Sequence, residues 1–367
     1  MTGPRFTTLA QSLPATVPFV GPEAQERARG AAFAARLGAN ESVFGPSPKA
    51  IAAMEAAAAE VWKYADPESH ALRHALADHH GVAADEIVVG EGIDGLLGYT
   101  VRLLIGPGDV AVTSDGAYPT FNYHVAGFGG RLEKVPYRED HEDADALIAK
   151  AAETGAKLVY FANPDNPMGS WHNADRVQAM IEAVPDGTLL ILDEAYVDCA
   201  PERTASPIDT SDARVLRMRT FSKVYGMAGA RVGYAIGHRD TVRAFEKIRN
   251  HFGMNRIAQA GALAALQDSV WLAEARARIE RARDRIAQTA QDNGLRPLPS
   301  ATNFVTIDCG RDGAFAKALL GAILAEGVFA RMPFVAPQDR CIRISCGTDA
   351  DLALFAEVLP KALAATK

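Results

Sequence analysis

The chain has 367 residues, of which 48% are hydrophobic and 23% charged, and its formal net charge is -7. This length predicts two or three domains, and the composition excludes a disordered chain, a collagen-like repeat and a small disulfide-rich protein. Because basic residues are in deficit, the chain is not expected to bind nucleic acid.

The N-terminal residues are not expected to form a targeting signal. Residues 1–22 hold no continuous apolar run and are interrupted by Pro14, Pro18 and Pro22, so they do not resemble a signal peptide. No window reaches ~18 apolar residues, so no membrane span is expected. The cysteines lack C-x-x-C spacing, which favours free thiols and a cytoplasmic location. They are Cys199, Cys309, Cys341 and Cys346.

From residue 50 to about 260, short apolar runs alternate with helical stretches. The apolar runs, typical of strands buried on both faces, lie at 86–90, 109–113, 157–161, 188–192 and 215–218. The helical stretches lie at 50–60, 69–80, 93–104 and 174–183. This alternation predicts an α/β fold with a mostly parallel sheet and right-handed crossovers.

After about residue 260 the pattern changes. A long helix is expected at 269–291. Strands are expected at 303–308, 328–332 and 341–345, and helices at 314–325 and 349–364. This pattern favours a second, smaller α+β domain. Because no low-complexity linker separates the two parts, we expect them to pack closely.

Residues 90–95 read G-E-G-I-D-G and fit the G-x-G-x-x-G pattern. They follow a predicted strand and open a helix, and Asp115 lies 20 residues beyond Gly95. This is the local context of a dinucleotide-binding fingerprint. A glycine-rich turn at a helix N-terminus attracts a phosphate whatever molecule carries it, and such a turn can also lack a ligand. Taken alone, the segment indicates an NAD-dependent oxidoreductase.

Polar side chains follow three later predicted strands. N-P-D-N-P-M-G occupies 163–169, D-E-A-Y occupies 193–196, and T-F-S-K occupies 220–223, with Arg231 eight residues further on. Since the carboxyl ends of parallel strands line one crevice, we expect these groups around one ligand. Each has an ordinary explanation alone, such as a turn, a helix cap or a surface ion pair. Their combination in this order indicates a catalytic site.

The residue types at these strand ends suit pyridoxal phosphate. The amine of Lys223 can bind the cofactor aldehyde covalently. A carboxylate such as Asp193 beside the pyridine nitrogen keeps that nitrogen protonated. A phenol and an amide can hold the phenolate oxygen, while hydroxyls, an arginine and a helix N-terminus can hold the phosphate.

Four segments carry a family resemblance. They are A-N-E-S-V-F-G-P-S-P at 39–48, Y-A-D-P at 64–67, G-E-G-I-D-G-L-L at 90–97 and T-F-S-K-V-Y-G-M-A-G-A-R at 220–231. In that order they resemble N-E-N-x-x-G-P-S-P, Y-P-D, G-N-G-S-D-E and T-x-S-K-x-x-x-L-A-G-x-R. These are motifs of fold-type I pyridoxal-phosphate aminotransferases of class I/II, most similar to the histidinol-phosphate aminotransferases. The resemblance runs from about residue 37 to the C-terminus and assigns the phosphate at 90–97 to pyridoxal phosphate.

The resemblance implies a role for each site residue. As catalytic residues, Lys223 binds the cofactor and moves the proton from the substrate α-carbon, Asp193 pairs with the pyridine nitrogen, and Tyr196 holds the phenolate oxygen with Asn166. Tyr118 is implied to stack on the ring. The implied phosphate-binding residues are Gly92, Ile93, Asp94, Thr220, Ser222, Arg231 and, across a dimer interface, Tyr64. The implied substrate-binding residues are Arg343, which clamps a carboxylate, Arg331 and Asn40.

The resemblance also implies a reaction and a domain organisation. It favours transfer of an amino group between histidinol phosphate and 2-oxoglutarate by a homodimer with a shared active site. An N-terminal segment at 1–45 joins the small domain, a large cofactor-binding domain covers 46–260, and a small α+β domain covers 261–367. The alternatives are an aromatic amino acid aminotransferase, a decarboxylase or lyase with the same cofactor, an NAD-dependent oxidoreductase and a non-catalytic amino-acid sensor. Aromatic rings that could line such a site are Phe19, Phe44, Tyr118 and Phe121.

The chain departs from the family pattern at four positions. Glu91 stands where the family has Asn, Gly95 where it has Glu, Met168 where Thr is usual, and Ser42 where Asn is common. The charge of Glu91 is unfavourable near a phosphate unless the side chain points away. No metal is expected, because no Cys or carboxylate accompanies the clustered histidines at ligand spacing. Those histidines are His74, His79 and His80.

Overall fold

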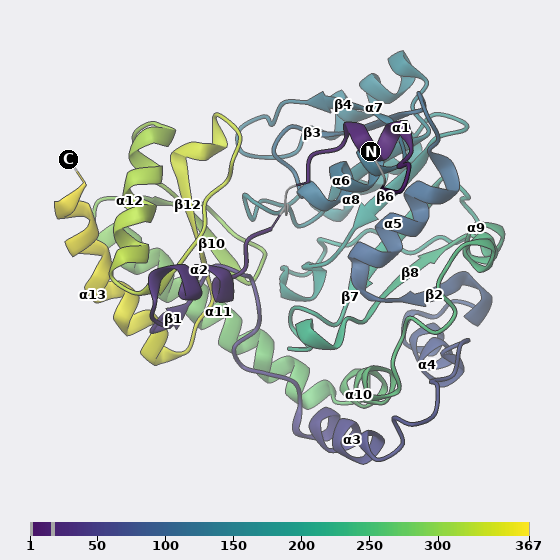
Figure 1. Cartoon of the computed structure of the whole chain (residues 1–367), viewed down its shortest axis with the longest axis horizontal. Coiled ribbons are helices and arrows are strands. Elements are labelled where there is room, and N and C mark those ends of the chain that lie inside the picture. Colours follow the sequence, from purple (N-terminus) through teal and green to yellow (C-terminus); the bar gives the residue numbers. More distant parts are fainter. Residues whose placement is uncertain (1–2, 16–18, 367) are drawn as a thin grey trace.

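The computed structural model describes residues 3–15 and 19–366 and contains two bodies (Figure 1). We call the seven-stranded sheet and the helices packed on it the large body, and the three-stranded sheet with its helices the small body. The strands are β1 Ala35–Arg36, β2 Ile87–Gly90, β3 Val110–Ser114, β4 Arg131–Val135, β5 Leu158–Ala162, β6 Leu189–Asp193, β7 Val215–Thr220, β8 Gly233–Gly237, β9 Arg296–Pro297, β10 Phe304–Asp308, β11 Val328–Phe329 and β12 Cys341–Ser345.

Helices surround both sheets, and none of those described is long and apolar enough to cross a membrane. They are α1 Thr8–Ser12, α2 Pro22–Arg29, α3 Pro48–Ala58, α4 His70–His80, α5 Gly92–Leu104, α6 Pro119–Gly127, α7 Ala144–Thr154, α8 Ala174–Glu182, α9 Arg239–Ala244, α10 Arg256–Leu266, α11 Ser269–Asp292, α12 Gly313–Ala325 and α13 Asp349–Ala365. Short 3₁₀ turns are η1 Ala84–Glu86, η2 Val197–Cys199, η3 Ala228–Ala230, η4 Phe245–Lys247 and η5 Gln338–Arg340.

The large sheet has the strand order β2-β8-β7-β6-β5-β3-β4. Neighbouring strands from β7 to β4 run parallel, whereas β8 is antiparallel to both β7 and β2. The prediction of a mostly parallel α/β sheet is confirmed, with β2 and β8 as the exceptions. Two strands of this sheet were not predicted from the sequence. β4 is an edge strand with only Val135 buried, and β8 is a five-residue run with glycine at both ends.

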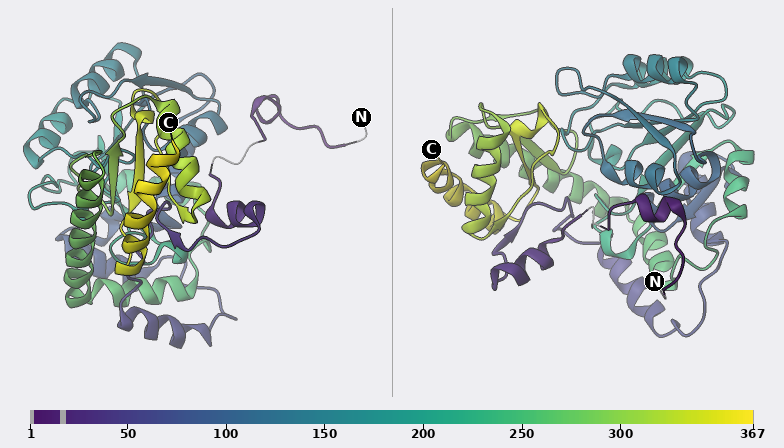
Figure 2. Two further views of the ribbon diagram at one scale, coloured as in Figure 1. Left: turned by 90° about the vertical axis from the view of Figure 1, so that its left-hand side faces the viewer. Right: turned by 45° about the horizontal axis from the view of Figure 1, so that its top comes forward.

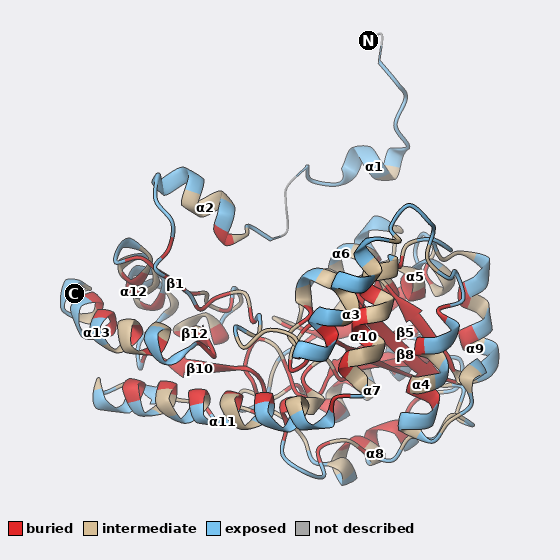
Figure 3. Ribbon diagram, turned by 90° about the horizontal axis from the view of Figure 1, so that it is seen from below, coloured by how far each residue is buried: buried red, intermediate tan, exposed pale blue. Residues whose placement is uncertain are grey.

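Three apolar clusters hold helices against the large sheet, whose strands other than the edge strand β4 are buried (Figure 3). α5 and α6 pack on one face through side chains such as Leu97 and Phe121. α7 and α8 share a second cluster with β3, β5 and β6, and α3, α4 and α10 share a third with β2 and β8. The helix starts follow local signals. At α3, Ser47 Oγ accepts the N–H of Ala50 and Pro48 takes the first helical position.

The small body is an antiparallel sheet in the order β12-β10-β9, covered by α11, α12 and α13. β1 pairs in parallel with β11, which brings the N-terminal part of the chain to the small body. β11 ends at Phe329 and is shorter than the predicted 328–332. α1 has no buried residue and stands outside both bodies (Figure 2). The domain boundaries at 45/46 and 260/261 stay predictions.

Candidate active site

The carboxyl ends of β5, β6 and β7 bring the predicted site residues to one edge of the large sheet. Asp193 is the last residue of β6, and Thr220 is the last residue of β7. Lys223 is the third residue after the end of β7, and Asn166 is the fourth residue after the end of β5. This placement follows from the parallel crossovers, which point these strands in one direction.

Asp193 is a buried carboxylate, 5% exposed, that lacks a cation. Its Oδ2 accepts a hydrogen bond from the Tyr160 hydroxyl at 2.7 Å, and its Oδ1 accepts the N–H of Ala195 at 2.9 Å. Burial raises the pKa of Asp193 to about 6, although these hydrogen bonds and the charge of Lys223 act in the opposite direction. No Lys, Arg or His nitrogen in the described part of the chain lies within 4.0 Å of this carboxylate. A protonated pyridine nitrogen would supply the missing positive charge.

Lys223 lies in a polar cluster centred on Asn40. Its Nζ donates to the Asn40 carbonyl at 3.2 Å and lies 5.1 Å from the centre of the Tyr196 ring. Asn40 Nδ2 donates to the Tyr196 hydroxyl at 3.2 Å. Asn40 is buried in a left-handed conformation with φ 56°, held by Asn303 and Ser345. Lys223 and Tyr196 therefore lie together as expected, with Asn40 beside them. Asn166, the amide expected at Tyr196, instead accepts from Arg343.

Thr220, Ser222 and Arg231 converge as expected for a phosphate site. The Thr220 hydroxyl donates to Ser222 Oγ at 2.9 Å, and Arg231 Nη1 reaches the same oxygen at 3.4 Å. Arg231 has a φ of 56° at the end of η3, which turns the chain there. Two hydroxyls and a guanidinium in one place suit a phosphate group.

The N-terminus of α5 faces this hydroxyl and guanidinium cluster. Gly92 has a φ of +79°, and a Cβ built there would lie 2.4 Å from Arg231 Nη2. Ile93 is buried next to it. The Asp94 carboxylate lies 3.8 Å from Arg231 and accepts the Tyr118 hydroxyl at 2.9 Å. Only glycine leaves room for the arginine here, and the exposed N–H groups of a helix start favour a phosphate.

The Arg343 side chain projects from β12 of the small body toward the large body. Nη1 donates to the Asn166 side-chain oxygen, Nη2 donates to the Gly38 carbonyl at 3.4 Å, and the guanidinium lies 5.1 Å from the centre of the Phe304 ring. Burial lowers its pKa, and its Nε is buried without a hydrogen-bond partner among the described residues. The guanidinium can therefore accept an anionic partner.

Two predicted residues lie apart from this cluster. The backbone of Arg331 pairs with that of Arg343, but its side chain donates to the Val20 carbonyl and lies 3.8 Å from the centre of the Phe19 ring. Burial and the charge of Arg343 lower the pKa of Arg331 to about 10. Tyr64 is 78% exposed, with its ring 4.6 Å from that of Phe252. Within one subunit, Tyr64 is not brought to the phosphate site.

Two of the four departures from the family pattern, Glu91 and Met168, have structural explanations. The Glu91 carboxylate accepts the Tyr99 hydroxyl at 3.1 Å and fills the space beside Gly253, so it points away from Arg231. Met168 is fully buried in a small cluster with Leu298 and Cys341. Neither side chain contacts the Lys223 cluster.

The sequence analysis missed several residues that support the site. Tyr160 holds Asp193 from inside β5, where its apolar neighbours gave no sign of a polar role. Asn303 is fully buried and donates to the Asn40 carbonyl at 3.0 Å, from a chain segment more than 260 residues away. Asp165 accepts the Tyr137 hydroxyl at 2.9 Å. Burial raises the pKa of Asp165 to about 7. Only the Asp165 position lay within a motif that the sequence analysis had singled out.

The dinucleotide-binding interpretation of residues 90–95 is wrong. β2 lies at one edge of the sheet, and its only strand neighbour in the described sheet, β8, is antiparallel. Asp115 follows β3, four strands away from β8, and forms an exposed ion pair with Lys134. A dinucleotide site needs a parallel β-α-β unit that brings the acidic residue to the ribose.

The described part of the chain holds no group of three His, Cys, Asp or Glu side chains arranged for a metal. The four cysteines are buried free thiols. The donor set at the strand ends instead fits pyridoxal phosphate: an amine at Lys223, an unpaired buried carboxylate at Asp193, and a glycine-lined cradle at Gly92 beside Arg231.

Known proteins are similar in sequence to this chain over most of its length. A family model for aminotransferase class I and II matches residues 35–359. A histidinol-phosphate aminotransferase of Anaeromyxobacter sp. (strain Fw109-5) is 37% identical over 87% of this chain and 88% of that protein. One of Moorella thermoacetica is 30% identical over 99% of this chain and 94% of that protein.

Solved structures share the fold. The crystal structure of histidinol-phosphate aminotransferase from Sinorhizobium meliloti, in complex with pyridoxal-5'-phosphate, is 54% identical with a TM-score of 0.96, covering 99% of this chain and 98% of that one. Aspartate aminotransferase from Thermus thermophilus with maleate has the same fold at 21% identity, with a TM-score of 0.82 over 98% and 100% of the two chains. The predictions of fold type I, of an aminotransferase-type enzyme and of pyridoxal phosphate as cofactor are confirmed. This chain belongs to the aminotransferase class I and II family of pyridoxal-phosphate enzymes.

Proposed function

We propose that this enzyme moves an amino group between histidinol phosphate, the favoured amino donor, and 2-oxoglutarate. The observation that carries the proposal is the Arg343 guanidinium, whose side-chain partner is the neutral Asn166 rather than a carboxylate. A guanidinium available in this way can bind the carboxylate of glutamate or 2-oxoglutarate through two hydrogen bonds. The names of the similar proteins support histidinol phosphate as the other substrate.

The bound cofactor accepts the electron pair released at the substrate α-carbon. We assign to Lys223 the attachment of the cofactor and the movement of the α-carbon proton. Asp193, oriented by Tyr160, keeps the ring nitrogen protonated. Tyr196, oriented by Asn40, is positioned to hold the phenolate oxygen, and Asn166 is its proposed companion.

The proposed phosphate site combines Thr220, Ser222, Arg231 and the start of α5. The Asp94 carboxylate contacts Tyr118 and Arg231, so we assign it to hold these two side chains in place. Its backbone N–H, in the first turn of α5, is a proposed donor to the phosphate. We assign Tyr118 to the face of the ring.

The substrate side of the site is less aromatic than the sequence predicted. Phe121 is fully buried and stacks on Tyr160 at 5.0 Å, and Phe44 packs against the core of the small body. Phe19, half-exposed beside Arg331, and Tyr118 remain as candidate walls for a flat ring. We propose that Arg331 and Arg343 together serve both the phosphate of histidinol phosphate and the carboxylates of the acceptor.

We propose a homodimer with a shared active site. Trp62 and Tyr64 are 77% and 78% exposed, and Phe252 is 54% exposed beside Tyr64. An aromatic surface of this kind is typical of an interface. Tyr64 can then complete the phosphate site of a second subunit. A cytoplasmic location stays a prediction.

The experiment is a comparison of kcat/KM for histidinol phosphate and phenylalanine, with 2-oxoglutarate as acceptor and glutamate formation as the readout. We expect histidinol phosphate to be preferred. A preference for phenylalanine of tenfold or more, about 1.4 kcal/mol in transition-state binding, would make the enzyme an aromatic aminotransferase. Release of carbon dioxide or of a side-chain fragment without glutamate would indicate a decarboxylase or lyase.

A further inference from the structure

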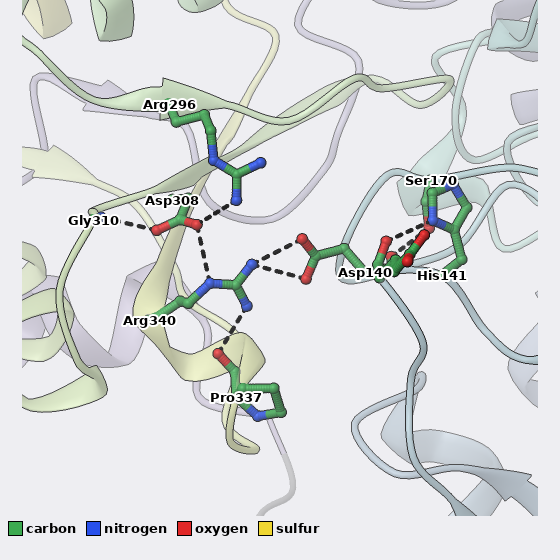
Figure 4. A network of polar contacts seen from close by, with 9 residues as sticks. Asp140, His141, Ser170, Arg296, Asp308, Gly310, Pro337 and Arg340 are labelled. Carbon is green, nitrogen blue, oxygen red and sulfur yellow. Dashed lines mark hydrogen bonds and ion pairs between the residues drawn. The ribbon is translucent and has the colours of Figure 1, made fainter.

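Arg340 connects the small body to the large body through a network of polar contacts (Figure 4). It lies in η5, directly before β12, the strand that carries Arg343. Its Nη2 donates to both carboxylate oxygens of Asp140 at 2.9 and 2.8 Å, and its Nε donates to Asp308 at 3.0 Å. Arg340 and Asp140 are 22% and 21% exposed, so solvent screens this pair less than a surface pair.

On the large body, Asp140 connects to the loop after β5. The Asp140 carbonyl accepts the Ser170 hydroxyl at 2.9 Å. The Ser170 carbonyl accepts the N–H of Asp165 at 2.9 Å. The residue after Asp165 is Asn166. The backbone of Asp140 has a φ of 64°, and Glu139 before it has a φ of 50°. Two consecutive non-glycine residues in this region indicate that surrounding contacts hold the turn in place.

A further contact leads from the loop after β5 back to β12, the strand that follows Arg340. The Asn166 side-chain oxygen accepts from Arg343, three residues beyond Arg340. The contacts therefore form a closed ring that passes between the two bodies twice, once at Arg340–Asp140 and once at Arg343–Asn166. The ion pair is partly buried, and the second contact lies at the proposed substrate site.

We infer that Arg340 is a positioning residue that sets the relative placement of Arg343 and Asn166 by docking the start of β12 onto Asp140. The inference rests on the proposed roles of Arg343 and Asn166. Since substrate-positioning groups must be placed within a fraction of an ångström, loosening the outer contact is expected to reduce catalysis without removing any group that touches substrate.

Other contacts join the same segments, so the Arg340–Asp140 pair is one of several ties. The Thr306 hydroxyl donates to the Pro167 carbonyl at 2.6 Å, and the Ala301 N–H donates to the Gly169 carbonyl at 2.9 Å. These contacts keep the bodies together when the ion pair is lost. We therefore expect a graded loss of function rather than unfolding.

The chain offers a matched control. Arg296 on β9 donates to the same Asp308 oxygen at 2.6 Å, and its side chain is 63% exposed. Among the described residues its side chain forms no hydrogen bond or ion pair with the large body. Arg296→Gln removes one charged hydrogen bond from Asp308, as Arg340→Gln does, and leaves the contact with Asp140 intact.

The experiment combines amide hydrogen exchange with kinetics on the holoenzyme. In Arg340→Gln we expect faster exchange in the segment 163–170, and a fall of roughly tenfold in kcat/KM for glutamate. Arg296→Gln should match the wild type in both. Asp140→Asn should reproduce Arg340→Gln, and the double variant should be no worse than either single one, because the two residues form one contact. Arg340→Lys, which retains the charge but not the two-pronged geometry, should lie between.

The inference is wrong if Arg340→Gln and Arg296→Gln change the exchange of 163–170 equally, or if the losses of Arg340→Gln and Asp140→Asn add. If Arg340→Gln fails to fold, Asp140→Asn alone tests the same contact. Hydrogen exchange does not depend on the reaction. A wild-type enzyme that turns over no glutamate but shows the expected exchange pattern would therefore refute the proposed function and leave the docking contact supported.

Discussion

Asp193 shows how one buried side chain can be built for a charged cofactor. Burial removes its carboxylate from water and raises its pKa to about 6, although two hydrogen bonds lower it. The carboxylate forms no ion pair with any residue that the structure describes. Without the cofactor this costs stability, because the ionised form is poorly solvated. A protonated ring nitrogen beside it offsets that cost, so cofactor binding and ionisation of Asp193 should favour each other.

The first prediction concerns the pH dependence of the apoenzyme. The pKa of Asp193 in the folded protein lies above its ordinary value of 3.8, so the folded state binds the proton more tightly than the unfolded state does. The favourable contribution of Asp193 to the free energy of unfolding is therefore complete below pH 3.8 and is lost as the pH rises towards about 6. Relative to Asp193→Asn, the wild-type apoenzyme should lose about 1.4 kcal/mol of unfolding free energy between pH 5 and pH 8. Urea unfolding at the two pH values measures this. A difference between the two proteins that does not change with pH would show that Asp193 is already ionised at pH 5.

The second prediction concerns Lys223. Lys223→Ala should reduce turnover by at least about 10³-fold, because the amine both attaches the cofactor and carries the proton. Borohydride should fix the cofactor covalently to the wild type but not to this variant. Lys247→Ala, at an exposed lysine, is the control and should behave as the wild type. Retention of a borohydride-fixed cofactor in Lys223→Ala would mean that another amine holds it.

At the residue scale, the sequence indicated the side chains at the strand ends better than the residues that support them. Lys223, Asp193 and Arg231 stand out because charged side chains directly follow apolar strands. Tyr160 and Asn303 could not be predicted in this way. Tyr160 lies inside a strand, where a tyrosine is ordinary core, and Asn303 meets Asn40 only through the tertiary fold.

At the scale of elements, the start of α5 is the most constrained part of the site. The turn places Gly92 so close to Arg231 that a Cβ there would lie 2.4 Å from Nη2 and would require the guanidinium to shift. The helix begins there because the left-handed conformation of Gly92 turns the chain from β2 into α5. The sequence motif predicted the glycine turn that leads into α5, and its role in binding phosphate stays a prediction. The neighbours of β2 in the sheet, which the motif does not report, excluded the dinucleotide interpretation.

The third prediction follows from this geometry. Gly92→Ala should displace Arg231 and add backbone strain of about 1–2 kcal/mol, so the dissociation constant of pyridoxal phosphate should rise roughly tenfold. Fluorescence titration of the apoenzyme measures it. Gly95→Ala is the matched control, because its Cβ would come no closer than 3.3 Å to the Glu91 side chain and its φ is ordinary. Equal affinities in the two variants would remove α5 from the phosphate site.

The strands that the sequence predicted are the buried, branched-chain runs in the middle of the sheet. β4 has only one buried residue, and β8 is short and flanked by glycines, so neither shows a pattern that separates it from a loop. The direction of β8 depends on how η3 turns the chain back at Arg231, which a hydrophobic pattern does not report.

At the scale of the whole molecule, long-range pairings assemble the site. β1 joins β11, and Asn40 reaches Lys223, Asn303 and Ser345. These contacts link the N-terminal part of the chain, the large body and the small body at one point. Only the family resemblance predicted that the N-terminal segment joins the small domain. The sequence pattern could not, because a two-residue strand such as β1 has no pattern of its own.

The fourth prediction tests the shared site. Lys223→Ala and Tyr64→Phe subunits, each impaired alone, should give mixed dimers in which one site contains both Lys223 and Tyr64. Activity should therefore rise on mixing, up to about a quarter of the wild-type value for random exchange of equal amounts. The control is a mixture of Lys223→Ala and Asp193→Asn subunits. Asp193 and Lys223 of one subunit should serve the same site, so every site in this mixture lacks one of them and no activity should be recovered. Equal behaviour of the two mixtures would place Tyr64 outside the partner's site.

The half-reaction of the holoenzyme with histidinol phosphate tests the proposed amino-group transfer. It is monitored through the visible absorbance of the cofactor, with no acceptor present. The account predicts that histidinol phosphate converts the aldehyde form of the cofactor to the amine form in one turnover. Addition of 2-oxoglutarate should then restore the aldehyde form with one glutamate per site. No spectral change with histidinol phosphate, or a change that 2-oxoglutarate does not reverse, would contradict it.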